Sequence, residues 1–141
     1  PTKKVKFASL IAILAAFPAL VQADTCPTKL HYSVAGYWYS NQYPGWSSTK
    51  AFAQHITVNP TDFNAAIYSP TKQRIACVYK NSNNEWTPIV SHKHPGLTID
   101  KGALNLAHQK VWQWNQRHKD YACSKPHINA ISECRFTIEE K

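Results

Sequence analysis

Four cysteines constrain the fold of this chain more than any other feature of its sequence. They stand at Cys26, Cys77, Cys123 and Cys134, and no two of them form the C-x-x-C pair that is typical of zinc sites. An even number of cysteines in a small exported domain predicts disulfide bonds, each of which contributes roughly 2–4 kcal/mol to stability. Four cysteines allow three pairings, and the sequence does not select among them. We therefore expect two disulfides, on the condition that the chain leaves the cytoplasm.

The first 23 residues have the pattern of a secretory signal peptide. Three lysines among the first six residues precede an apolar run over residues 7–20, and Val21-Gln22-Ala23 then supplies the small or aliphatic residues that a signal peptidase reads. The apolar run is shorter than the roughly 20 residues that span a bilayer, which disfavours a membrane anchor. We predict cleavage after Ala23 and no transmembrane segment thereafter. Residues 1–23 are thus expected to be a signal peptide, and residues 24–141 a single β-rich domain in the periplasm or the external medium.

The size and charge of this exported part limit what it does. The 118 residues that remain of 141 are enough for one domain with a modest core. Its formal charge is +5, against +8 for the whole chain, because the three lysines of the leader are lost. A basic excess of this size favours attraction to anionic surfaces such as an envelope or a polysaccharide.

Turn signals at short intervals indicate a mainly β domain. Pro-Gly, Asn-Pro and Ser-Pro pairs and an Asn-rich run recur between segments of strand length. In "RIACVY", residues 74–79, the alternate residues Ile75, Cys77 and Tyr79 share one face, and both residues between them are apolar as well. That pattern predicts a central strand covered on both sides. We expect a small antiparallel sandwich or barrel-like domain with two disulfides.

Residues 102–116 allow two interpretations. Ala103, Ala107 and Val111 fall on one stripe of a helix that Asp100 would cap. The alternation of Leu104, Leu106, Trp112 and Trp114 instead suits a strand, and a helix would leave Leu106 and Trp112 off its apolar stripe. The sequence slightly favours the strand, and one helix around residues 102–116 stays open.

Short motifs of cysteines and aromatics recur along the exported part, namely Cys26-Pro27, Gly36-Tyr37-Trp38, Trp46, Phe52, Cys77-Val78-Tyr79, Cys123 and Cys134-Arg135-Phe136. Their spacing resembles a family of small exported proteins of unknown function in Gram-negative bacteria. The resemblance implies a β-rich, disulfide-bonded domain in the periplasm or the medium, and it implies no activity or catalytic residue. The stretch "SHKHPGLTIDKGALNLAHQ", residues 91–109, has no counterpart in that pattern.

The stretch "GYWYSNQYPGW", residues 36–46, holds the candidate ligand-binding aromatics. On a strand, Trp38 faces the core while Tyr37 and Tyr39 form a half-buried rim on the other side. Tyr43 and Trp46 flank a Pro-Gly pair that favours an exposed loop tip. Exposed there, the two rings would make a platform for a sugar or an anchor for a protein partner.

Seven histidines invite a metal hypothesis. His92 and His94 are the closest pair, and on a strand both rings would project from one face as two metal ligands. A zinc site needs a third or fourth ligand, and the sequence supplies no recognisable one nearby. Solvated loop histidines are the favoured interpretation.

Enzymatic activity is poorly supported. The chain has no G-x-S-x-G motif, oxidised cysteines lack a nucleophilic thiolate, and no motif indicates a cofactor. A histidine-dependent secreted nuclease is one alternative, with "WNQRHKDY", residues 114–121, against the phosphate chain. A solvated charged turn is the preferred interpretation of that stretch, which makes nucleic acid a disfavoured partner. The sequence favours a non-catalytic binding module for a carbohydrate or protein ligand, with an exported metal-binding protein as a further alternative.

Overall fold

The computed structural model describes residues 24–53, 62–81 and 83–139, and the predicted signal peptide lies outside them. Within these ranges the chain forms ten strands and a single turn of 3-10 helix, Ile131–Glu133. No helix in this part of the chain has the length and apolar character needed to cross a membrane. The strands are β1 (His31–Tyr32), β2 (Trp38–Tyr39), β3 (Ser47–Ser48), β4 (Asp62–Ser69), β5 (Arg74–Lys80), β6 (Trp86–Val90), β7 (Leu97–Ile99), β8 (Gln113–Asn115), β9 (Asp120–Ser124) and β10 (Phe136–Ile138).

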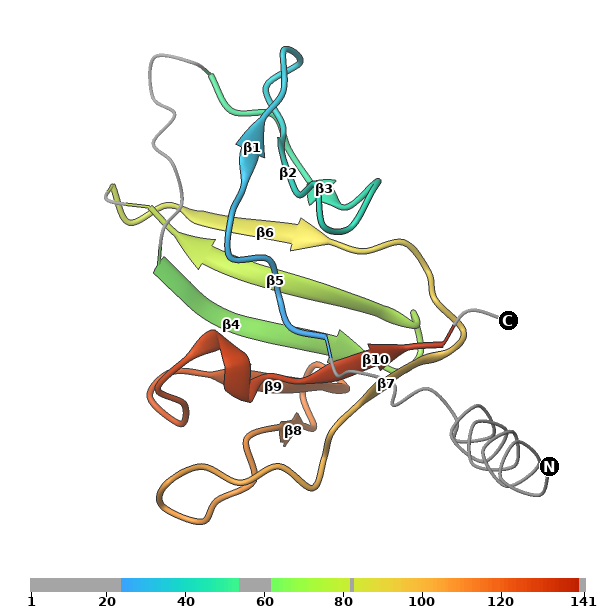
Figure 1. Ribbon diagram of the computed structural model, residues 1–141, viewed down its shortest axis with the longest axis vertical. Coiled ribbons are helices and arrows are strands. Elements are labelled where there is room, and N and C mark those ends of the chain that lie inside the picture. Colours follow the sequence, from blue (N-terminus) through green and yellow to red (C-terminus); the bar gives the residue numbers. More distant parts are fainter. Residues whose placement is uncertain (1–23, 54–61, 82, 140–141) are drawn as a thin grey trace, which may run out of the picture.

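Eight of these strands form one antiparallel sheet in the order β1-β2-β3-β6-β5-β4-β9-β8, and β10 pairs with β7 in a second, small sheet. Figure 1 shows the long strands β4, β5 and β6 at the centre of the main sheet. The predicted mainly β, antiparallel fold is confirmed. The barrel-like form of that prediction is wrong, because the main sheet is open, with β1 and β8 at its two edges.

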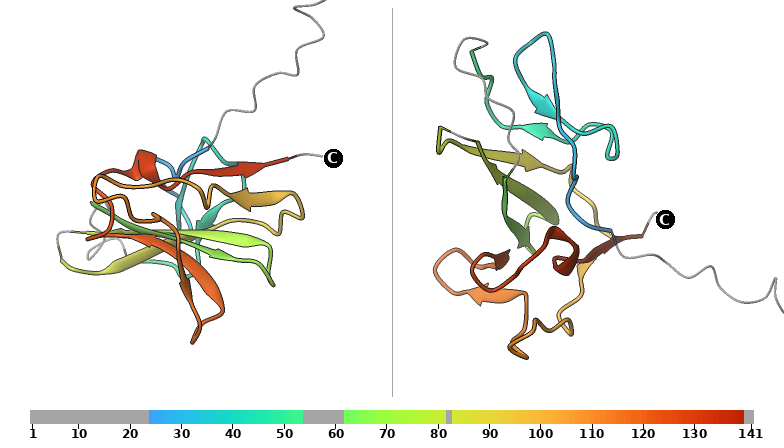
Figure 2. Two further views of the ribbon diagram at one scale, coloured as in Figure 1. Left: turned by 90° about the horizontal axis from the view of Figure 1, so that it is seen from below. Right: turned by 60° about the vertical axis from the view of Figure 1, so that its left-hand side comes forward.

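One face of the main sheet is covered by a second layer. The segment that begins at Asp24 crosses this face in front of β5 and β4, and the small sheet lies over the same side (Figures 1 and 2). The two covering parts are joined, because Asp24 and Phe136 exchange backbone hydrogen bonds of 2.7 and 3.0 Å. The hydroxyl of Tyr68 on β4 also donates to the carbonyl of Leu97 on β7, at 3.2 Å. We call this side of the sheet the covered face.

The core lies between these layers, and β5 supplies its centre. Ile75, Cys77 and Tyr79 point into it and are buried, as their alternation predicted. Ile89 of the neighbouring β6 and Phe136 of the covering layer are also completely buried in the same cluster. Apolar side chains at every second position thus fix which face of each strand turns inward.

Two disulfides fasten the covering layer to the sheet, which confirms the predicted number. Cys26 of the N-terminal segment is bonded to Cys77 on β5, and Cys123 on β9 is bonded to Cys134 just before β10. All four cysteines are completely buried, and none is free. Each bond therefore joins one strand of the main sheet to one part of the layer that covers it.

Residues 102–116 form no helix. The strand interpretation is confirmed only at β8, and an isolated bridge between Leu104 and Lys110 closes a tight turn before it. Asn105 builds this turn, because its side-chain oxygen accepts hydrogen bonds from the amides of Ala107 and Gln109 at 2.9 and 3.0 Å. Asp100, the expected helix cap, instead accepts from the amide of Gly102 at 3.2 Å. Local side-chain bonds to the backbone have thus replaced the helix.

Candidate functional site

The Tyr43–Trp46 platform is not exposed, and that expectation was wrong. Pro44-Gly45 does form a turn, with Gly45 at a φ of +85°, but both neighbouring rings fold back onto the protein. Trp46 is only 1% exposed. Its ring stacks on Tyr43 with centroids 4.1 Å apart, and its centroid lies 6.0 Å from that of the Phe136 ring. A Pro-Gly pair determines how the backbone turns, while the aromatic rings follow the apolar surface beneath it. Trp46 is therefore a core residue.

Of the other two aromatic candidates, Tyr39 is half-buried as the sequence predicted, whereas Tyr37 is not: it is exposed and lies just before β2. Trp38 is buried, as expected. The Tyr39 ring lies against His31, its partner on β1, with ring centroids 5.6 Å apart. A ligand-binding role for Tyr37 and Tyr39 stays a prediction.

His92 and His94 do not form the expected pair on a strand, because they lie in the loop between β6 and β7. The exposed His92 ring lies directly against Gly45 and leaves no room for a Cβ atom there. The His94 ring packs near Trp46, with ring centroids 6.1 Å apart. Its Nε2 atom is buried without a hydrogen-bond partner among the described residues. In the same part of the chain, no three His, Cys, Asp or Glu side chains are grouped to hold a metal ion.

Three of the predicted site residues nevertheless line one pocket of about 400 Å³, namely Tyr43, Trp46 and His94. Asp24, Gln42, Pro44 and Ile138 line the rest of it. Burial raises the pKa of the Asp24 carboxyl, and burial together with that carboxylate raises the pKa of the Tyr43 hydroxyl. The Tyr43 hydroxyl is already committed, since it donates to the carbonyl of Thr25 at 2.7 Å. A ligand in this pocket would thus contact mainly the side chains of core residues.

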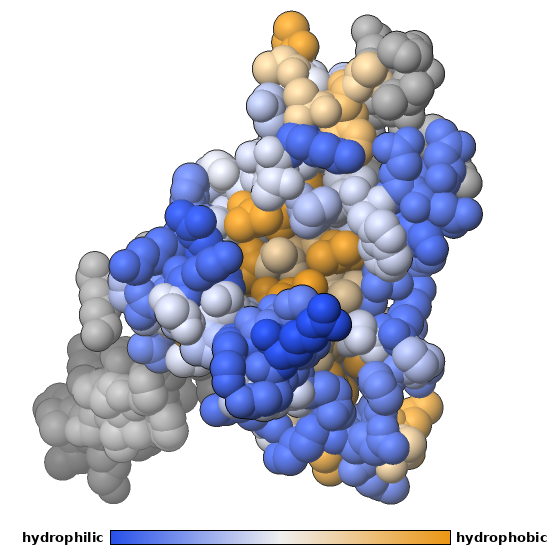
Figure 3. Space-filling model, turned by 180° about the vertical axis from the view of Figure 1, so that it is seen from behind, coloured by the Kyte–Doolittle hydropathy of each residue, from blue (hydrophilic) through white to orange (hydrophobic). Residues whose placement is uncertain are grey.

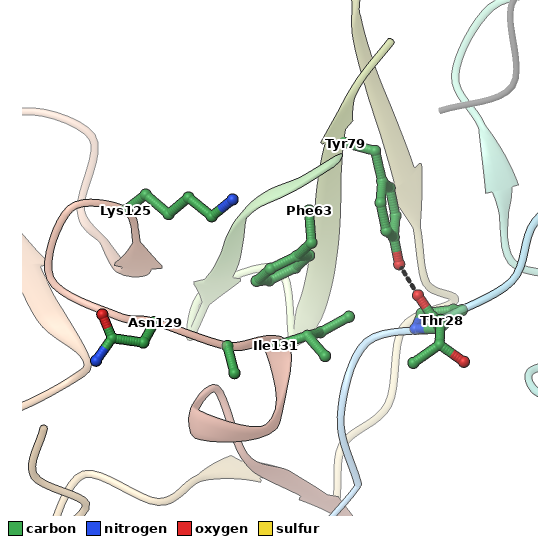
Figure 4. Close-up of a pocket in the computed structure, with 8 residues that line it drawn as sticks. Thr28, Phe63, Tyr79, Lys125, Asn129 and Ile131 are labelled. Atoms are coloured by element: carbon green, nitrogen blue, oxygen red, sulfur yellow. Dashed lines mark hydrogen bonds between the residues drawn. The ribbon is translucent and has the colours of Figure 1, made fainter. Parts of the chain in front are cut away.

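A second pocket, of about 240 Å³, opens beside the N-terminal segment and was not foreseen from the sequence (Figure 4). Phe63 and Tyr79 form its apolar wall, with ring centroids 5.7 Å apart. The Tyr79 hydroxyl donates to the carbonyl of Pro27, and Lys125 at the rim is paired with Asp62 at 2.7 Å. Its polar groups are thus largely engaged with the protein itself.

The most distinctive surface is the other side of the main sheet, which we call the open face. The strand β5 was expected to be covered on both sides, and here that expectation was wrong. Ala76 and Val78, the apolar residues that point away from the core, are only half-buried. Figure 3 shows this side of the molecule, with apolar side chains gathered in a hollow between hydrophilic walls.

The floor of the open face is one apolar row across four strands. Val90 of β6 pairs with Ala76 of β5, Ala76 with Ile67 of β4, and Ile67 with Ala122 of β9. All four are half-buried. A parallel row follows toward the far end of β5, where Val78 pairs with Pro88. Directly paired residues of neighbouring strands lie side by side on one face, so these side chains form a continuous surface.

The two ends of the open face carry a cation and an exposed indole. At one end, Lys72 and Arg74 line a groove of about 330 Å³. Its floor includes Val90, Ala76 and Ile67 of the apolar row, and Asp120 is the one acid among the described residues that line it. At the other end, Trp86 is 50% exposed, and the ammonium group of Lys80 lies 4.8 Å from the centre of its ring. Arg74 and Lys80 are six residues apart on β5, so these ends are about 20 Å apart. The sequence signal for this surface was present in the second apolar face of "RIACVY".

Comparison with known proteins adds no relative: no protein-family model, no curated protein and no solved structure matches the chain. The resemblance to small exported Gram-negative proteins therefore stays a prediction. The assignment of a candidate site therefore rests on the geometry of this chain alone.

Proposed function

We propose that this chain is an exported, non-catalytic binding module, and that the open face of its main sheet holds a protein ligand. The observation that carries the proposal is the half-buried apolar row Val90–Ala76–Ile67–Ala122, which crosses four strands of the open face. Along the strand direction, cations flank this row on one side and the exposed Trp86 lies on the other. An apolar centre with a polar rim is the usual anatomy of a protein–protein interface. Trp and Arg are also the residues that most often dominate the energetics of such interfaces.

The chemistry of the face favours a protein segment over a carbohydrate. Sugars are held chiefly by flat aromatic platforms, whereas the floor here consists of aliphatic side chains and a single indole at one end. Lys72 and Arg74 outnumber Asp120 around the groove. At the other end, Lys80 and Lys125 outnumber Asp62, the cross-strand partner of Lys80, so the surface has a positive excess. A complementary ligand is an extended segment that combines aliphatic and acidic side chains.

Export is part of the same proposal. Two buried disulfides fit a protein that matures outside the cytoplasm, where such bonds form and persist. Cleavage after Ala23 would leave Asp24 as the first residue, and its backbone nitrogen already donates to the carbonyl of Phe136 at 2.7 Å. N-terminal sequencing of the exported protein should begin at Asp24. An intact leader on the exported protein would contradict this part of the proposal.

An array of random-sequence peptides tests the binding proposal. Bound peptides should be enriched in acidic and aliphatic residues, and Trp86→Ala and Arg74→Glu should each reduce their binding at least fivefold. Trp114→Ala and Lys29→Glu are matched controls, because Trp114 is similarly exposed and the exposed Lys29 lies on the N-terminal segment that crosses the covered face. Equal losses in the test and control variants would reject the open face as the site. If the protein bound to a glycan array and Trp86→Ala abolished that binding, the ligand would be a carbohydrate and not a protein.

A further inference from the structure

A second candidate surface lies in the stretch from Lys101 to Lys119, which leads into the edge strand β8 and borders the open face. These residues include Lys101, Lys110, Arg117 and Lys119 but not a single Asp or Glu. All four cationic side chains are exposed. The segment is therefore a continuous source of positive charge on a chain that is already basic.

The same segment exposes three large apolar side chains. Leu104 is 52% exposed, Leu106 is 84% exposed and Trp114 is 46% exposed. Half of the large hydrophobic residues that are exposed in the described part of the chain thus fall within eleven consecutive positions. Isolated exposed leucines need no explanation, but a cluster of this kind marks an interaction surface.

The exposure of the two leucines is fixed by the structure of their turn. The Asn105 side chain, which accepts two backbone hydrogen bonds within the turn, also donates from its amide nitrogen to the carbonyl of His127 at 2.6 Å. The backbone amides of Asn105 and Val111 bond to the carbonyls of Gln109 and Ala103 at 2.9 and 3.1 Å. Ala103 and Val111 on either side are buried. The turn is thus anchored at its base and holds Leu104 and Leu106 out toward solvent.

Trp114 is placed in an amphipathic setting. Its ring lies on Tyr121 with centroids 4.8 Å apart, and its indole nitrogen donates to the side chain of Gln116 at 2.8 Å. The ammonium group of Lys101 lies 5.3 Å from the centre of the same Tyr121 ring. Aromatic rings with a polar edge, beside lysine, are the side chains that concentrate at the boundary between lipid and water.

We propose that residues 101–119 form a docking surface for an anionic phospholipid bilayer. Leu104, Leu106 and Trp114 would enter the boundary between headgroups and acyl chains, while the four cations contact lipid phosphates. The turn 104–110 extends from the body of the molecule, at the bottom of Figure 1. A projecting tip of this kind enters a soft lipid interface without a preformed pocket, whereas a protein partner would have to supply one.

Cosedimentation with lipid vesicles tests this surface, using protein purified after expression of the full chain. The protein should bind vesicles of mixed phosphatidylglycerol and phosphatidylcholine, and high salt should release it. It should not bind vesicles of phosphatidylcholine alone. Substituting Arg117→Gln and Lys119→Gln together should weaken binding roughly 25-fold, from roughly fivefold per cation. Lys29→Gln with Lys93→Gln removes two exposed cations elsewhere and is the matched control, with a much smaller effect expected.

The apolar contacts need their own variant. Leu106→Ser should reduce vesicle binding at least fivefold, while Val34→Ser, at a fully exposed position outside the segment, should leave it unchanged. Thermal unfolding should confirm that both variants fold. Equal binding to neutral and anionic vesicles, equal losses in test and control variants, or no binding to anionic vesicles at low salt would each overturn the proposal. The last result would assign the exposed leucines to a protein partner instead.

Discussion

The Tyr43 ring stacks on the Trp46 indole with centroids 4.1 Å apart and planes inclined by 15°. This pair closes one end of the core, since Trp46 also contacts Phe136 and Tyr43 bonds to the N-terminal segment at Thr25. The stretch that looked like a ligand platform thus holds the covering layer in place.

Removal of the Trp46 ring should therefore weaken the fold. We expect Trp46→Ala to lower the free energy of unfolding by about 3–5 kcal/mol, because a completely buried indole leaves a cavity. Trp114→Ala, at a half-exposed indole, should cost less than about 1 kcal/mol. Urea unfolding of both variants measures the difference, and similar losses would show that Trp46 is not a core residue.

The two disulfides should differ in their contribution to stability. Cys26–Cys77 spans 51 residues and Cys123–Cys134 only 11, and a longer loop restricts the unfolded chain more strongly. Substituting both cysteines of the long loop with serine should cost about 4 kcal/mol, against about 3 kcal/mol for the short loop. Guanidinium unfolding of the two double variants gives the values. A larger loss for the short loop would contradict this ranking.

The two faces of the main sheet predict different costs for the same substitution. Ile75 on β5 is completely buried, so Ile75→Ala should cost about 2–5 kcal/mol. Ile67 on β4 belongs to the half-buried row of the open face, and Ile67→Ala should cost less than about 1.5 kcal/mol. Unfolding titrations compare the two directly. Equal costs would mean that the open face is packed like the covered one.

The protein should lose stability at alkaline pH, chiefly because of two of the three tyrosines whose pKa is raised. Burial raises the pKa of Tyr43 and of Tyr79, with smaller contributions from Asp24 and from Tyr43 respectively. The unfolded chain releases these protons above about pH 10 while the folded chain retains them, so stability is full below that pH and falls above it. Tyr43→Phe should flatten this fall in a series of urea titrations. Tyr37→Phe, at an exposed ring, should not, and equal slopes for both variants would remove Tyr43 as a cause.

Much of the fold was predictable from the sequence because strands with one buried face repeat every second residue. The alternation of Ile75, Cys77 and Tyr79 correctly placed β5 in the centre of an antiparallel sheet. The number of disulfides followed from the cysteine count. Their pairing did not, because it depends on which segment covers which strand, and that relation between distant residues leaves no local pattern.

The candidate site was less predictable, for a related reason. The sequence identified apolar residues on both faces of β5, but no local pattern tells which face distant segments cover. Among the described residues, a second layer lies over one face, and Ala76 and Val78 on the other face are half-buried. Exposure of an aromatic ring likewise depends on distant partners. Trp46 is buried by Phe136, which is 90 positions away, whereas Trp86, which no sequence motif singles out, is exposed on the open face.

The measurement that tests the central claim most directly is a chemical-shift map of the isotopically labelled protein during titration with an acidic, aliphatic peptide. The account predicts that the shifts concentrate on the open face, at the amides of Ile67, Ala76 and Val90 and at the indole of Trp86. Shifts confined to the covering layer or to the turn 104–110, or no shifts with any such peptide, would contradict it.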